Sequence, residues 1–260
     1  MNELPPIEVA PPPVPQPLSL MDRLTGVFVS PGEVFDSLKT SPPAVINWLL
    51  PLVLFLLVSW VGAVIVFSNP AVQRQIQEIQ EQAIQKQVEA GKITQQQADQ
   101  IVQMTGKYAD IGAKAGAFIG PVFVAFLSVF GWGFAYWLVA LMSGQRFRYM
   151  KGVEAVGLSN LITVLEAVVH WLLLAAMGTM LTSFSPVLFL KNPDPSGAAY
   201  AFFSMLGFIG LWCLGVRAVA LSRLGGLSLT LSALWVFGLY LVFCGGLVGL
   251  GQLAQMVGGR

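Results

Sequence analysis

Five apolar runs, each long enough to cross a bilayer, constrain the fold more than any other feature of the sequence. A transmembrane helix needs about 20 predominantly apolar residues, and each run is longer than that and nearly free of charge. Inside a bilayer, a helix satisfies its own backbone hydrogen bonds. The sequence therefore predicts an all-α, polytopic membrane helix bundle of five spans, at residues 44–68, 116–142, 156–181, 199–221 and 229–252.

Composition agrees with a membrane protein and excludes several functional classes. Charged residues make up 10% of the chain, whereas soluble domains carry about 25%. A formal net charge of +1 gives no basic surface for nucleic acid. Cys213 and Cys244 lie inside apolar runs, which indicates small buried side chains rather than a disulfide framework. No phosphate-binding loop, H-E-x-x-H or C-x-x-C motif is present, so we expect a non-enzymatic protein without cofactor or metal.

The residues before the first span fall into two parts. Residues 1–18 hold seven prolines and are predicted to form a disordered tail. Residues 19–43 are expected to form two short amphipathic helices at the membrane surface, because neither is long enough to cross it. Ser30, Pro31 and Glu33 have the pattern of a helix start with a capping box. The apolar sides of the two helices would consist of Leu20, Leu24, Val27, Phe28, Val34, Phe35 and Leu38.

A glutamine-rich stretch at residues 69–115 separates the first two apolar runs. Apolar residues recur in it at helical spacing, Gly91 interrupts the pattern, and Thr94 can cap a second helix. The stretch is therefore predicted to be an extramembrane helical hairpin inserted within the five-span domain at residues 44–252.

Basic residues predict the orientation of the bundle. With five spans, the N-terminal side carries most of the basic residues of the short segments: Arg23, Lys39, Arg146, Arg148, Lys151 and Arg223. Such residues favour the cytoplasm. The hairpin on the opposite side has balanced charge. We expect a cytoplasmic N-terminus, in a bacterial cytoplasmic membrane.

Glu166 and His170 are the candidate polar site within the membrane. They stand one helical turn apart in the third run, and ionisable groups at this depth usually face a protein interior or a water-filled cavity. They could form a proton relay, or a structural polar pair with Arg217 of the fourth run. Arg217 could instead extend to the interface. An intramembrane enzyme using Cys213 as well is a further alternative.

Arg146, Arg148 and Lys151 form a basic cluster with Phe147 and Tyr149 in the connector before the third run. Such a cluster suits anionic lipid headgroups, and it also serves as a topological anchor. Glycines at positions 112, 116 and 120, and at 245 and 249, repeat every fourth residue and hint at close helix packing.

The start of the first span, NWLLPLVLFLL, follows the segment RLTGVFVSPGEVFDSLKTSP, which contains a P-x-x-x-F element. This opening resembles that of the Yip domain family, the Ypt/Rab-interacting membrane proteins. GQRFRYMKGVEAVGLSNL and FSMLGFIGLWCLGVRAVALSRLGGLSLTLSALWV resemble its later spans and turn, while Arg217 departs from the apolar residue expected there. The resemblance implies five spans, a cytosolic N-terminus and, in eukaryotic members, association with Rab GTPases. The glutamine-rich stretch resembles the insertion that bacterial-type members carry between the first two spans.

Two functional hypotheses follow. The first is a non-enzymatic membrane organiser or adaptor, with membrane lipids and an unknown membrane or cytosolic protein as partners, a small GTPase by family analogy alone, and possible homo-oligomers. The alternative is a transporter or transporter subunit that uses Glu166 and His170 in a polar cavity.

Overall fold

The computed structural model describes residues 18–179, 184–191 and 197–257, and its elements within these ranges are helical. Five helical segments are long and apolar enough to cross a membrane: Ile46–Ser68 (α3), Ile111–Met142 of α5, Tyr149–Met177 (α6), Phe208–Gly225 (α8) and Leu229–Leu253 of α9. The predicted all-α, five-span architecture is confirmed. The tail at residues 1–17 lies outside the described residues.

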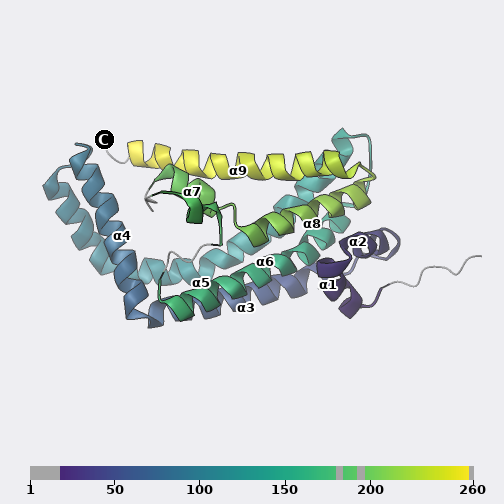
Figure 1. Ribbon diagram of the computed structural model, residues 1–260, viewed down its shortest axis with the longest axis horizontal. Helices are drawn as coiled ribbons and strands as arrows, with labels where there is room; N and C mark the ends of the chain where they lie inside the picture. Colours follow the sequence, from purple (N-terminus) through teal and green to yellow (C-terminus); the bar gives the residue numbers. More distant parts are fainter. Residues whose placement is uncertain (1–17, 180–183, 192–196, 258–260) are drawn as a thin grey trace, which may run out of the picture.

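Helix α6 is at the centre of the bundle. It packs against α3, α5 and α8, while α9 (Leu229–Val257) packs mainly on α8. Figure 1 shows α1 (Leu20–Val29) and α2 (Pro31–Thr40) at one end of the long axis, and α4 with the C-terminal end of α9 at the other. The first part of α6 is buried without interruption from Lys151 to Ile162, which is why its polar side chains there must find partners inside the protein.

Helices α1 and α2 are part of the bundle. Val27, Val34, Phe35 and Leu38 are fully buried, on the sides that helical spacing predicted, and contact α6 and α8. The apolar sides of α1 and α2, which we expected at the membrane surface, thus pack against other helices of the protein. The predicted Ser30 capping box is wrong, since that side chain caps nothing, whereas Ser19 and Asp22 form one at the start of α1.

The glutamine-rich stretch contains two helices. The side chain of Asn69 caps the start of α4 (Pro70–Glu89) by accepting hydrogen bonds from two backbone N–H groups. The turn after α4 contains Gly91 at a positive φ of 67°. The predicted cap at Thr94 is confirmed, as part of a capping box with Gln97. The second helix does not end before the next span: α5 (Gln95–Met142) continues as one helix of 48 residues.

The fourth apolar run differs from the expected helix at residues 199–221. It contains a short helix, α7 (Ala198–Ser204), then a break and α8. Gly207 is the extended residue before α8, and the break is held by hydrogen bonds from Phe208 N–H to the Phe184 carbonyl and from Tyr240 Oη to the Met205 carbonyl. Broken helices persist at membrane depth when other segments satisfy their backbone groups in this way.

Close helix contacts are made by glycines other than the periodic ones. A Cβ on Gly157 of α6 would overlap the Trp48 backbone of α3, and a Cβ on Gly62 of α3 would overlap the Trp171 ring of α6. The glycines at 112, 116, 120, 245 and 249 have open space beside them. The hint of packing drawn from their spacing is wrong within this chain.

Replacing Gly157 by Val is expected to loosen the α3–α6 contact. The added side chain meets the Trp48 backbone, and overpacking of this kind costs about 1–3 kcal/mol. The melting temperature of the purified protein in detergent should fall clearly, whereas Gly249→Val in α9, where space is open, should leave it nearly unchanged. Equal shifts in the two variants would contradict this assignment.

Candidate functional site

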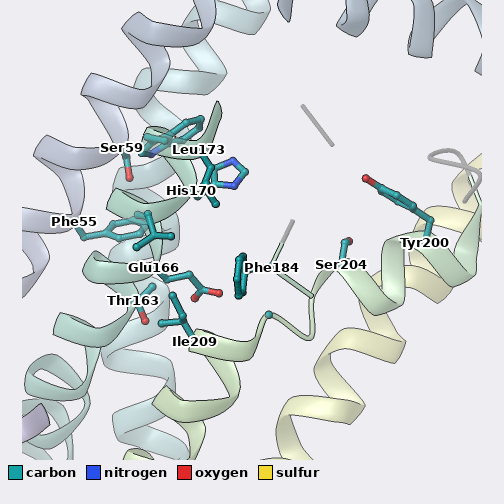
Figure 2. Close-up of a pocket in the computed structure, with 14 residues that line it drawn as sticks. Phe55, Ser59, Thr163, Glu166, His170, Leu173, Phe184, Tyr200, Ser204 and Ile209 are labelled. Carbon is teal, nitrogen blue, oxygen red and sulfur yellow. The ribbon is translucent and has the colours of Figure 1, made fainter. Parts of the chain in front are cut away.

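A cavity of about 430 Å³ lies between the second half of α6, the start of α8, α3 and α7. Glu166 and His170 both line it, on successive turns of α6, with Tyr200 and Ser204 of α7 across from them. Figure 2 shows these side chains together with Phe184 and Ile209, which belong to the apolar part of the wall. The structure thus brings the predicted Glu166 and His170 to one cavity.

The Glu166 carboxylate also has a structural task. It accepts a hydrogen bond from the Gly210 backbone N–H, in the first turn of α8. Gly207 permits this approach, because a Cβ there would overlap Glu166 Oε1. A carboxylate at a helix N-terminus satisfies free N–H groups and offsets the positive end of the helix dipole. Glu166 therefore supports the helix start that follows the break.

Arg217 belongs to a different site. Its guanidinium is buried, donates a hydrogen bond of 2.5 Å to Asn160 Oδ1, and lies 5.1 Å from the centre of the Trp132 ring. The Tyr136 hydroxyl donates to the Arg217 backbone carbonyl at 3.1 Å. The ion pair of Arg217 with Glu166, expected as one alternative, is wrong, because among the described residues no carboxylate lies within ion-pair distance of Arg217. An amide and a ring hold it instead.

A buried charged cluster at the start of α6 was missed by the sequence analysis. Lys151 Nζ lies 3.1 Å from Glu154 Oε1, and Asn47 of α3 donates a hydrogen bond of 2.6 Å to Glu154 Oε2. Both side chains of the ion pair are almost completely buried. The i,i+3 spacing of Lys151 and Glu154 is the signal that could have found the pair, but Asn47 is 107 positions away.

The three basic residues of the connector are therefore placed differently. Arg146 and Arg148 are exposed, whereas Lys151 is buried against Glu154. Within the described ranges, Arg146 and Arg148 have no carboxylate partner. The same ranges contain no group of three His, Cys, Asp or Glu side chains that could hold a metal ion. Cys213 and Cys244 are buried and free, as predicted.

Removing one member of the buried ion pair should be far more harmful than removing both charges. Lys151→Met leaves the Glu154 carboxylate buried without its cation, and a loss of about 3–5 kcal/mol is expected in SDS-induced unfolding. The double variant Lys151→Met/Glu154→Gln removes both charges and retains an oxygen that can accept from Asn47, so most of the loss should be recovered. A double variant as unstable as Lys151→Met alone would contradict this account.

Of three comparisons with known proteins, one found a match. Comparisons with curated proteins and with solved structures give no match. A family model, described as the Yip1 domain, matches residues 25–251, which include the first four candidate spans in full, nearly all of the fifth and the second half of α1. The chain therefore belongs to the Yip1 domain family of integral membrane proteins.

Proposed function

We propose that this protein is a non-enzymatic membrane organiser or adaptor of the Yip type, with its N-terminus in the cytoplasm of a bacterial cell. The observation that carries this proposal is the burial of α1 and α2 against α6 and α8. Because Val34, Phe35 and Leu38 are fully buried, the exposed sides of these helices form a surface fixed to the spans. A fixed surface lowers the entropy cost of binding a partner.

We call this the N-terminal surface, and it consists of the exposed residues of α1 and α2, the connector at residues 143–148 and the turn at 226–228. An ion pair of 3.0 Å between Asp36 of α2 and Arg223 of α8 connects α2 to the end of α8, just before that turn. Met21 and Val29 of α1 are exposed apolar side chains of the same surface. A mixed surface of this kind suits a membrane or cytosolic protein, with a small GTPase suggested by family analogy alone. Homo-oligomers are a further possible assembly.

A photo-crosslinking amino acid at Glu33 of α2 is expected to capture one identified cytosolic or membrane protein in living cells. The same probe at Glu89, at the end of α4, is the matched control, because Glu89 is an exposed glutamate at the opposite end of the molecule. The adduct should form at Glu33 and be absent at Glu89. No discrete adduct, or the same adduct from both positions, would argue against the adaptor. A periplasmic protein at Glu33 would overturn the orientation.

A second candidate is a proton-linked transporter or transporter subunit, supported by the cavity that Glu166 and His170 line. The carboxylate is its most informative residue. A relay would need Glu166 to exchange protons, whereas its contact with the Gly210 N–H needs only an accepting oxygen.

Glu166→Gln separates the two roles, because the amide oxygen can still accept from Gly210. If the protein is a transporter, wild-type protein in liposomes loaded with a pH-sensitive dye should admit protons under an applied potential, and the variant should lose this flux while keeping its melting temperature. His170→Gln, on the same cavity wall, is expected to lower the flux as well. A wild-type protein without flux, or a fully active Glu166→Gln variant, would exclude proton coupling through this residue.

A further inference from the structure

A second pocket, of about 680 Å³, lies at the N-terminal surface. Its walls are the last turn of α2 with the following residues 41–43, and the connector between α5 and α6. Lys151 in the first turn of α6 and Leu224 of α8 complete it. The pocket therefore joins three segments that are far apart in the sequence.

The charged side chains that line this pocket are all positive. Four cationic side chains line it and no acidic one does: Lys39, Arg146, Arg148 and Lys151. Lys39 is balanced by Asp36 at 3.6 Å, and Lys151 by Glu154 at 3.1 Å. Arg146 and Arg148, which have no carboxylate partner in the described ranges, leave the pocket with unbalanced positive charge.

Lys151 gives the pocket a buried ammonium group. Only 7% of its side chain is exposed, and its Nζ is within ion-pair distance of Glu154 but makes no hydrogen bond. An ammonium group has three donors, so this one keeps hydrogen-bonding capacity. Its Nζ is enclosed by protein at the edge of the pocket, so water screens its charge less than that of a surface lysine.

The backbone at the start of α6 also favours an anion at this pocket. α6 begins at Tyr149, directly after Arg148, and no side chain caps its N-terminus. The first N–H groups of a long helix carry partial positive charge and favour anions, above all phosphate. Arginine and lysine side chains bind phosphate by charge-assisted hydrogen bonds. A helix start, a buried lysine and two arginines that no described carboxylate pairs with thus meet at one pocket.

We propose that this pocket binds a phosphate group. Because α3 and α6 both start at this end of the bundle, the headgroup of an anionic lipid can supply the phosphate, and a soluble phosphate compound shares the same chemistry. The proposal goes beyond the adaptor function and does not depend on it, since binding requires only the pocket and no protein partner.

The test uses the purified full-length protein in a neutral detergent and measures binding by calorimetry. The probes are dioctanoyl phosphatidic acid, dioctanoyl phosphatidylcholine as the zwitterionic comparison, and inorganic phosphate. Phosphatidic acid is expected to bind clearly more tightly than phosphatidylcholine. Arg146→Gln/Arg148→Gln should weaken its binding by about tenfold or more, because two charge-assisted contacts are lost.

The matched control is Arg74→Gln/Lys92→Gln, which removes two exposed positive charges from the hairpin at the opposite end. Its affinity for phosphatidic acid should equal that of the wild type. Binding of inorganic phosphate with the same dependence on Arg146 and Arg148 would support the phosphate site with a soluble source, and binding of the lipid alone would support a headgroup source. The proposal is overturned if neither probe exceeds phosphatidylcholine, or if both double variants bind like the wild type.

Discussion

The buried ion pair of Lys151 with Glu154 is the interaction on which the arrangement of the spans depends. Two charges inside a helical bundle recover the cost of leaving water only where their positions are fixed and further hydrogen bonds support the pair. Asn47 supplies one such contact from α3, and it does so at the point where Gly157 lets the Trp48 backbone approach α6. Polar pairing and close packing thus define the same register of α3 against α6, and α5 and α8 pack around that unit.

The remaining polar residues of the spans also connect helices, in the second half of the fold. Helix α8 has 18 residues, about 27 Å at 1.5 Å per residue, slightly less than a hydrocarbon core of about 30 Å. The break before it exposes backbone groups that Glu166, Phe184 and Tyr240 satisfy. Arg217, further along α8, is held by Asn160 of α6. Each polar side chain therefore stabilises a helix junction that hydrophobic contacts alone would leave unspecified.

Properties local to one helix could be predicted from the sequence, and properties that join distant helices could not. Hydropathy predicted five spans, although not the break in the fourth run, and helical spacing identified Val34, Phe35 and Leu38 as a buried side. The partner of Arg217 was not predictable, because Asn160 is 57 positions away and nothing in the local pattern distinguishes it from Glu166. The glycine spacing did not predict the close helix contacts, for the same reason. It shows which helix faces carry small residues, whereas the contacts at Gly62 and Gly157 depend on where a tryptophan of another helix lies.

This division of tasks also separates structural residues from candidates for function. Glu166 and Arg217 have contacts that hold the helices together. These contacts explain, without a ligand, why the chain bears the free-energy cost of placing two ionisable side chains in a membrane. Arg146 and Arg148 are exposed, and no carboxylate in the described ranges pairs with them, although they stand directly before the most buried part of α6. Residues that the fold does not need, placed on a rigid element, are the ones whose chemistry is available to a ligand. The N-terminal surface is therefore a stronger candidate for function than the cavity within the membrane.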